Sequence, residues 1–560
     1  MDLGLSLPKS VENPGVDVEL RAGKLASWLD SLPILNLVDT SYKIYQSLSA
    51  TNRTRVDDKS RLKLLETYRQ PVATICDELE KEFIGNSLPL STKALQSATR
   101  ARSLQAEMAN GYKILAQDLA ENLNGKIKDK VKIQLAMTVQ RAIYHLASSL
   151  YYSYISYHPA TLGTWKEIHR LYEFASIYHA TDIEVDDLLN HTKGKSTASK
   201  NYKNAILLDL SGPYHLPGRS VQNIYHCLES WGDLASLETA TSLPKDSCQF
   251  LITKERDSSG EIYDGKNIDA AHLKNYLMLN TLELARYVHS RLKALNTGKI
   301  PEEKGNLGGV FTEETSRELL TKLVSSWGVN PKRHFRRISR KGDTVEVALG
   351  IESINFWLNG GETLTLSSEF VGPMPQKSKM GTLYMETSSE SDIPVTSVEL
   401  EKNPDLKFVE WDVVDESAGG IALSTSRVKH QRTKVGDIMA VRDGSAGHWE
   451  IVVIRWIQNT DSETVSIGTQ RLAPDAVSIA INVLDESGKD TKFKPALLLP
   501  AMQALKQPAT IVAEKSSLQR GQRFFMDNGY QMSEAQATRV LESTTAFERF
   551  EFSILQTAQT

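Results

Sequence analysis

Residues 332–341 carry the sharpest concentration of positive charge in the chain, because six of these ten residues are lysine or arginine. Arg333 and Arg337 lie four positions apart, with Arg336 and Arg340 beside them. The planar guanidinium group pairs in bidentate fashion with phosphate or with the O6/N7 edge of guanine, and its face can stack on a base. Taken alone, the run is open to two interpretations, an arm that binds a nucleotide-like anion or a solvated basic linker.

A second polar motif follows an expected strand, in the segment WDVVDESAGGIAL. Asp415 can accept hydrogen bonds from guanine N–H groups, and Ser417 can either donate or accept. Gly419 and Gly420 allow the backbone to turn tightly and to approach a ligand closely. Without the arginines, the same residues would be typical of an ordinary hairpin turn.

The two motifs in this order, Arg-x-x-x-Arg and then Asp-x-Ser-x-x-Gly, resemble the signature of the PilZ domain family over roughly residues 331–475. The resemblance implies a small antiparallel β-barrel that binds cyclic di-GMP. It places arginines on an N-terminal arm that clamps phosphates and guanines, while the Asp-Ser turn holds a guanine against the barrel. The implied ligand-binding residues are Arg333, Arg336, Arg337, Asp415, Ser417 and Gly420.

One feature departs from the family pattern. Arg333 and Asp415 are 82 positions apart, whereas family members usually separate the two motifs by a few tens of residues. A Ser-, Thr- and Pro-rich insertion over residues 360–406 accounts for the excess, since the entropy cost of closing a loop grows slowly with its length. An insertion that held the arm away from the barrel would instead leave a degenerate site.

The elements before the arginine run are expected to be helical. Apolar residues recur at spacings of three and four from about residue 18 to residue 295, with breakers between segments. We therefore predict an all-α region over 1–300, interrupted by a short β-hairpin near 248–265 and resuming as helix from 270. Residues 301–330 are predicted to form a Gly-, Pro- and charge-rich linker followed by one helix.

Beyond residue 344 the pattern changes to short alternating runs separated by turn residues, which predicts antiparallel β-barrel structure. We expect a PilZ-like barrel over 331–475 and a small β-rich subdomain over 476–560. A helix is expected to close the chain at 533–552. The predicted fold class is thus α+β and multidomain.

Composition restricts the function classes. The net charge of −4 offers no global attraction to nucleic acid or to an anionic membrane, and no run reaches the roughly 18 apolar residues of a spanning helix. The three cysteines lack Cys-x-x-Cys spacing, and the twelve histidines show no metal-ligand spacing. We expect a cytoplasmic protein with no metal, no cofactor, no bound nucleic acid and no membrane insertion.

Catalytic signatures are also missing, including a nucleophile elbow and the Gly-Gly-Asp-Glu-Phe motif of messenger synthesis, so we predict a receptor and not an enzyme. Ligand binding is expected to order the arm, change the orientation of the domains and expose a surface of the helical region to an unidentified protein partner. A resemblance to larger PilZ proteins suggests an output in type IV pilus motility. Two alternatives stay open: a ligand-independent helical scaffold with a degenerate barrel, and a single-stranded nucleic-acid binder.

Overall fold

The computed structural model of the 560-residue chain forms two compact units, Met1–Arg333 and His334–Thr560. It describes all residues except 13–17, 34–35, 124, 191, 263–269, 298–312, 329–336, 368–405, 427–431, 445–446, 460–463, 484–491, 503–505 and 556–560. Each unit is described by itself below.

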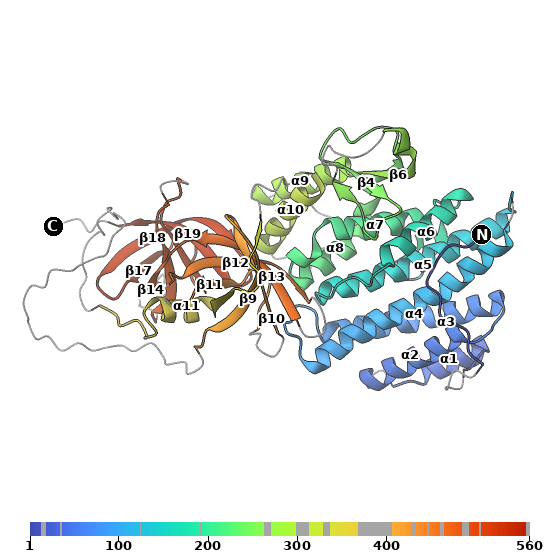
Figure 1. Cartoon of the computed structure of the whole chain (residues 1–560), viewed down its shortest axis with the longest axis horizontal. Helices are drawn as coiled ribbons and strands as arrows, with labels where there is room; N and C mark the ends of the chain where they lie inside the picture. Colours follow the sequence, from blue (N-terminus) through green and yellow to red (C-terminus); the bar gives the residue numbers. More distant parts are fainter. Residues whose placement is uncertain are drawn as a thin grey trace, which may run out of the picture. The chain divides into compact units, whose positions relative to one another are not determined.

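The first unit is built mainly of helices whose starts are encoded locally (Figure 1). Asp57, Ser91 and Thr197 precede three of them, and each side chain accepts a hydrogen bond from a backbone N–H of the first helical turn. The helices are α1 (Ala22–Asp30), α2 (Leu37–Arg53), α3 (Asp58–Lys81), α4 (Thr92–Asn122), α5 (Asp129–Ile155), α6 (Thr164–Ile177), α7 (Ala198–Leu210), α8 (Gly218–Trp231), α9 (Leu282–Asn296) and α10 (Glu313–Gly328).

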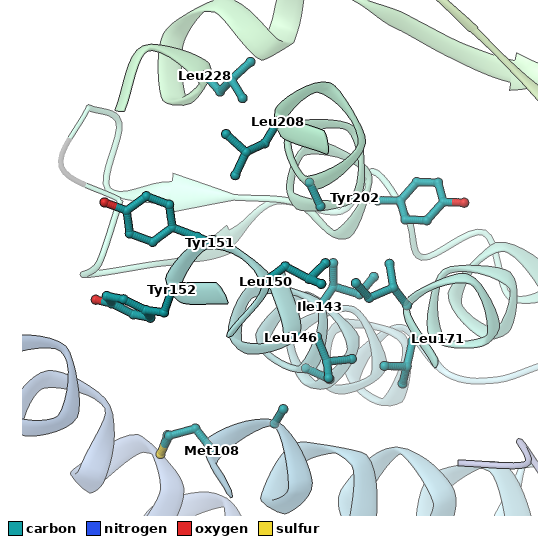
Figure 2. Packing of buried hydrophobic residues seen from close by; sticks show 14 of the residues in the cluster. Met108, Ile143, Leu146, Leu150, Tyr151, Tyr152, Leu171, Tyr202, Leu208 and Leu228 are labelled. Carbon is teal, nitrogen blue, oxygen red and sulfur yellow. The ribbon is translucent and has the colours of Figure 1, made fainter. Parts of the chain in front are cut away.

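One continuous apolar core joins these helices, and Figure 2 shows part of it around α5. Three tyrosines of α5, Tyr151, Tyr152 and Tyr154, belong to this core. Tyr151 and Tyr154 are buried, and their hydroxyls donate to Glu80 and to Asp209. These rings therefore serve packing with satisfied hydroxyl groups, which is the usual arrangement of buried tyrosine.

A four-stranded sheet interrupts the helices, in the order β3-β6-β4-β5. The expected hairpin is present as β4 (Gln249–Thr253) and β5 (Glu261–Ile262), and β3 (Ser236–Thr239) and β6 (Tyr276–Asn280) extend it. The prediction of continuous helix from residue 270 was wrong at β6, because YLMLN pairs with strands on both sides and helix α9 begins only after it. A separate two-stranded pair is formed by β1 (Val185–Asp186) and β2 (Lys195–Ser196).

The second unit begins with an antiparallel sheet in the order β10-β13-β12-β11-β8-β9-β7, and a further pairing of β10 with β9 closes it into a barrel. Buried and exposed residues alternate over Glu410–Val413, as the sequence pattern predicts, whereas Gly420–Leu423 and Ile451–Ile454 are buried at consecutive positions. The strands are β7 (Ile338–Ser339), β8 (Thr344–Leu349), β9 (Val409–Ser417), β10 (Gly420–Ser426), β11 (Ile438–Arg442), β12 (Glu450–Asn459) and β13 (Thr464–Ala473).

The remaining strands form a second, closed antiparallel barrel in the order β14-β15-β16-β19-β18-β17. The strands are β14 (Val477–Val483), β15 (Lys494–Leu499), β16 (Thr510–Glu514), β17 (Arg523–Asp527), β18 (Met532–Ser543) and β19 (Phe547–Ile554). The predicted terminal helix over 533–552 was wrong, because that segment forms the hairpin β18–β19. Its helix-forming composition is overridden by burial of Ala535, Ala537, Phe547 and Phe550 inside the barrel.

Helix α11 (Gly350–Leu358) follows β8 in the chain and packs against both barrels. Asn355 donates to the carbonyls of Ile479 and Ala496, both at 2.8 Å, and apolar residues of both barrels and of the helix share one cluster. Of the predicted insertion at 360–406, residues 368–405 lie outside the described residues.

Candidate functional site

A pocket of about 170 Å³ lies where strand β9 turns into β10. Arg337, Asp415, Ser417 and Thr469 supply its polar side chains. Arg337 Nη1 lies 3.1 Å from Asp415 Oδ2. We call it the turn pocket, and it is lined by Arg337, Asp415, Ser417, Gly419, Gly420, Ile421, Ala422, Gly468 and Thr469. An engineered cavity of about 150 Å³ in another protein holds one benzene ring, so the turn pocket has the scale of one aromatic ring.

Strand pairing brings the two motifs together. Ser339 pairs with Asp415, and Ile338 pairs with Glu416, so the short strand β7 runs along the end of β9. Because Arg337 directly precedes β7, this pairing places its side chain at the turn pocket. The backbone N–H of Val413 donates to the carbonyl of Asp343 at 2.8 Å, which continues the contact toward β8.

Two glycines make the pocket wall possible. A Cβ at Gly420 would lie 1.9 Å from the carbonyl oxygen of Thr469, and a Cβ at Gly468 would lie 1.8 Å from the Trp456 indole nitrogen. Gly420 does not adopt a positive φ, so close approach and not turn geometry requires glycine there. The polar wall beside it is completed by Thr469 Oγ1, which donates to the carbonyl of Ile421 at 2.9 Å.

Next to Asp415, Glu416 accepts hydrogen bonds from two arginines. Arg340 Nη1 donates to Glu416 Oε2 at 2.7 Å, and Arg471 Nη2 donates to the other carboxylate oxygen. Burial acts against the charged form of Glu416, but the hydrogen bonds from both arginines outweigh burial and lower the pKa of Glu416. Hydrogen bonds to Glu416, Asp443 and Asp343 raise the pKa of Arg340. This cluster is therefore fully ionised around neutral pH.

The predicted site residues divide into two groups. Arg337, Asp415, Ser417 and Gly420 line one pocket, and the long insertion does not keep Arg337 from Asp415. Arg333 and Arg336 lie outside the described residues. The ligand-binding role of all six stays a prediction.

Sequence reasoning did not select Thr469, Gly468, Glu416 or Arg471 as site residues. Gly468 carried a usable signal, because glycine inside a strand marks a place where another group approaches closely. Arg471 carried no such signal, since a single arginine in a strand is common on protein surfaces.

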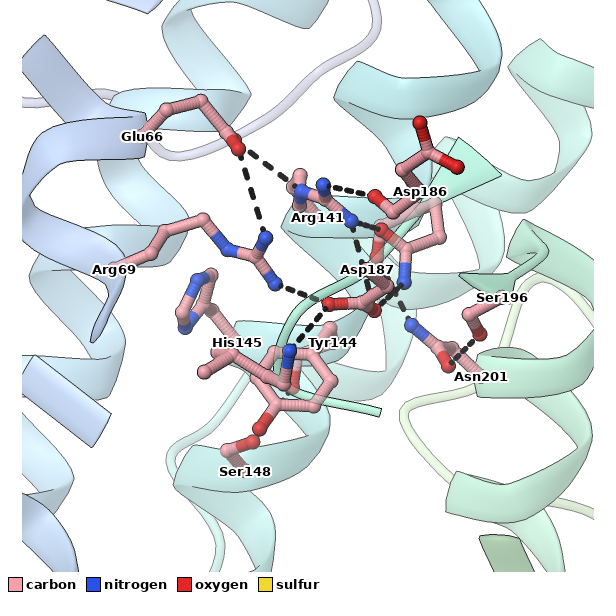
Figure 3. A network of polar contacts seen from close by, with 12 residues as sticks. Glu66, Arg69, Arg141, Tyr144, His145, Ser148, Asp186, Asp187, Ser196 and Asn201 are labelled. Carbon is pink, nitrogen blue, oxygen red and sulfur yellow. Dashed lines mark hydrogen bonds and ion pairs between the residues drawn. The ribbon is translucent and has the colours of Figure 1, made fainter. Parts of the chain in front are cut away.

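A second polar cluster lies in the helical unit, around Asp187 (Figure 3). Arg69 Nη2 contacts Asp187 at 2.8 Å, Gln140 donates to the same carboxylate, and Arg141 contacts Asp187 and Glu66. Burial opposes the charge on Asp187, yet Arg69 and Arg141 outweigh burial and lower the pKa of Asp187. Its carboxylate is thus paired within the protein, and the cluster connects α3, α5 and the β1 segment as a buried ion-pair network.

Among the described residues, no group of three or more His, Cys, Asp or Glu side chains is arranged to hold a metal ion. The described helices also include none that is both long enough and apolar enough to cross a bilayer.

Comparisons with known proteins match nearly the whole chain. Residues 23–243 match the family model "Cyclic-di-GMP receptor FimW, N-terminal domain", residues 249–370 and 374–477 match "Cyclic-di-GMP receptor FimW, middle PilZ domain", and residues 479–555 match "FimW C-terminal beta-barrel domain". The chain is 26% identical to the cyclic-di-GMP receptor FimW of Pseudomonas aeruginosa over 558 residues, covering 94% of this chain and 89% of that protein. No solved structure matched the chain.

Proposed function

The chain belongs to the family of cyclic-di-GMP receptors with a middle PilZ domain and a C-terminal β-barrel, and on this premise we propose that it binds cyclic di-GMP at the turn pocket. The family is one of binding proteins and not of enzymes. The observation that carries the proposal is the meeting of Arg337 with Asp415 and Ser417 in one pocket, although 78 positions separate Arg337 from Asp415.

The chemistry of the pocket suits one guanine base. Its volume of about 170 Å³ admits a planar aromatic group, Asp415 offers acceptors for the N1–H and N2–H groups, and Ser417 offers a hydroxyl. The Arg337 side chain, 46% exposed, can reach a phosphate or the O6/N7 edge. The phosphates and the second base of the ligand would then lie outside the pocket, where we expect Arg333 and Arg336 to contact them.

Calorimetric titration of the full chain with cyclic di-GMP tests the proposal. Micromolar affinity corresponds to about 8 kcal/mol, which several charge-assisted hydrogen bonds and base stacking can supply. The double variant Arg333→Ala, Arg337→Ala should weaken binding by on the order of 100-fold or more, because each arginine contributes charge-assisted bonds. Its thermal unfolding should stay close to that of the wild type.

Lys341→Ala is a matched control, because it removes one exposed positive charge from the same run without altering the pocket lining. It should bind within about twofold of the wild type, as expected for a single screened surface charge. Wild-type affinity in the double-arginine variant would refute the site. Absence of heat with the wild type would favour the ligand-independent scaffold, and a salt-dependent shift of a labelled oligonucleotide would favour the nucleic-acid binder.

We further propose that binding changes the orientation of the two units. Support comes from the boundary between them, which falls between Arg333 and His334, inside the arginine motif. A ligand that orders this segment would restrict how the units move, which is a switch based on the ordering of a segment. Small-angle X-ray scattering with and without cyclic di-GMP should show a change for the wild type and none for Asp415→Asn.

The output of the switch is proposed to be a protein partner bound by the helical unit, in the cytoplasm. The three cysteines are buried and form no disulfide bond in the part of the chain that the structure describes, which is compatible with a reducing compartment. Control of type IV pilus motility, suggested by the sequence resemblance, remains a prediction that motility assays of a strain carrying the double-arginine variant would test.

A further inference from the structure

Glu416 lies between Asp415 and Ser417 in the sequence, but it does not line the turn pocket. Neighbouring residues in a strand point to opposite faces, so Glu416 faces away from Asp415 and Ser417. Its two carboxylate oxygens accept hydrogen bonds from different arginines, Arg340 on one side and Arg471 on the other. Glu416 is 24% exposed, so these bonds are only partly screened by water.

Arg340 lies at the C-terminal end of the arginine-rich arm, directly after strand β7. Its Nε lies 2.8 Å from Asp343, and its Nη1 lies 3.2 Å from Asp443 in addition to the contact with Glu416. Three carboxylates therefore surround this guanidinium. Because these acidic partners already occupy its donors, Arg340 does not have the open guanidinium that a phosphate ligand would need.

Arg471 belongs to strand β13, on the other side of the turn. Its Nη1 donates to the carbonyl of Ser417 at 2.5 Å, its Nε contacts Glu450 at 2.8 Å, and its backbone N–H donates to the carbonyl of Gly419 at 3.0 Å. Arg471 thus stabilises the turn by hydrogen bonds to two of its backbone carbonyls, those of Ser417 and Gly419.

Resting on the proposed function, we infer that Glu416 is the positioning residue of the site, which ties the base of the arm through Arg340 to the Asp-Ser turn supported by Arg471. On the N-terminal side of Arg340, the arm pairs with β9 only through the two residues of β7, and the Arg340 nitrogen lies 3.4 Å from the carbonyl oxygen of Val414. On its C-terminal side, the 2.8 Å bond from Val413 to Asp343 leads into β8. The side-chain tether through Glu416 therefore reinforces the short β7 pairing that places Arg337 beside Asp415.

If Glu416 positions the arm, replacing it should change the affinity for cyclic di-GMP in the direction opposite to that expected from charge alone. Cyclic di-GMP carries two negative charges, so removing a nearby carboxylate should by charge alone tighten binding. If Glu416 positions the arm, removing its charge should weaken binding, because the arm base is released and must be ordered by the ligand. The sign of the change therefore separates the two roles.

The experiment is calorimetric titration of full-length Glu416→Gln with cyclic di-GMP beside the wild type. We expect affinity roughly five- to tenfold weaker, the effect of losing two partly screened charge-assisted hydrogen bonds. Asp443→Asn is the matched control, because it removes an exposed carboxylate from the same arginine without touching the turn. It should leave affinity unchanged or slightly tighter.

A double-mutant cycle shows whether Arg340 acts through Glu416. Arg340→Gln alone should weaken binding by a similar factor, and Arg340→Gln combined with Glu416→Gln should be no weaker than either single variant. Multiplying losses would mean that Arg340 contacts the ligand directly, and would overturn the inference.

The other outcomes are equally decisive. Equal or tighter binding by Glu416→Gln overturns the inference and leaves the proposed function standing. Loss of the unfolding transition of residues 334–560 in Glu416→Gln would make Glu416 a general structural residue, which also overturns it. A wild-type chain that binds no cyclic di-GMP overturns the proposed function and this inference together.

Discussion

At the scale of single residues, the turn pocket depends on groups placed by backbone pairing together with the proposed tether through Glu416. Asp415 stands near the end of strand β9, and Arg337 directly precedes β7, so their side chains meet at 3.1 Å. The wall opposite them is backbone, because Gly420 lets the carbonyl of Thr469 come closer than any side chain would allow. In the proposed site, the charged groups would provide specificity, and the glycine allows the shape of the wall.

Gly420→Ala should therefore disturb both stability and binding. The added Cβ would lie 1.9 Å from the Thr469 carbonyl oxygen, so β10 and β13 must separate beside the pocket. We expect a loss of about 1–3 kcal/mol in the free energy of unfolding, the usual cost of overpacking, with a large loss of affinity for cyclic di-GMP. Chemical denaturation and calorimetry measure the two effects.

Gly23→Ala serves as the control for this prediction. A Cβ at Gly23 meets nothing within 4 Å, and the residue lies in helix α1, where alanine is favoured. Its unfolding free energy should stay the same or rise. Wild-type stability and affinity in Gly420→Ala would show that the strands can accommodate the methyl group.

At the scale of elements, buried polar groups link the helices of the first unit. Glu80 of α3 accepts a hydrogen bond from the Tyr151 hydroxyl of α5 at 3.0 Å and another from Gln222 of α8. Only 7% of Glu80 is exposed. Burial raises the pKa of Glu80 to about 7, although both hydrogen bonds act in the opposite direction.

The buried Glu80 carboxyl predicts that the stability of the helical unit depends on pH. The pKa of Glu80 in the folded chain lies above its ordinary value of 4.5, so the folded state holds the proton more tightly than the unfolded state. The resulting stabilisation is complete below about pH 4.5 and is lost as the pH rises through about 7. Glu80→Gln should consequently gain stability relative to the wild type between pH 5 and pH 8, on the order of 2–3 kcal/mol at most.

Urea denaturation of both proteins at several pH values measures this difference. Glu78→Gln is the matched control, because Glu78 lies on the same helix with a 41% exposed side chain that pairs with Lys81. It should not show a gain that grows with pH. A constant difference between Glu80→Gln and the wild type would contradict the assignment of a buried, neutral carboxyl.

At the scale of the whole molecule, the two units have separate cores. The helical core contains residues from Leu3 to Trp327, whereas the barrels and α11 have clusters of their own within residues 334–560. The two barrels share one of these clusters with α11, so they should unfold together. The chain is therefore expected to unfold in two transitions.

Cyclic di-GMP should raise only the transition of residues 334–560. At a free ligand concentration of 100 times Kd the stabilisation is about 2.7 kcal/mol, and each kcal/mol shifts the midpoint of a unit of this size by roughly 2–4 °C. Differential scanning calorimetry measures the shift. Glu80→Gln at pH 8 identifies the helical transition, because it should move that transition alone.

Arg333→Ala with Arg337→Ala is the control, since the ligand should then shift neither transition. A single transition for the whole chain would contradict the independence of the two units. A ligand-induced shift confined to the helical transition would place the binding site in the first unit.

The sequence by itself determined the helical first half, the β-rich second half and the PilZ resemblance. These features depend on periodicity and on motifs that are local in the chain, so no tertiary information is needed to find them. The association of Arg337 with Asp415 could also be expected, but only through the family resemblance, because a separation of 78 positions hides it from local reasoning.

Tertiary structure alone decided the rest. The terminal segment 533–552 has helix-forming composition, yet barrel closure makes it a hairpin, because burial of its apolar residues between neighbouring strands outweighs local propensity. The roles of Thr469, Gly468 and Arg471 depend on which strand lies beside the turn. Strand neighbours are set by long-range pairing, and that pairing cannot be read from the residues on either side of it.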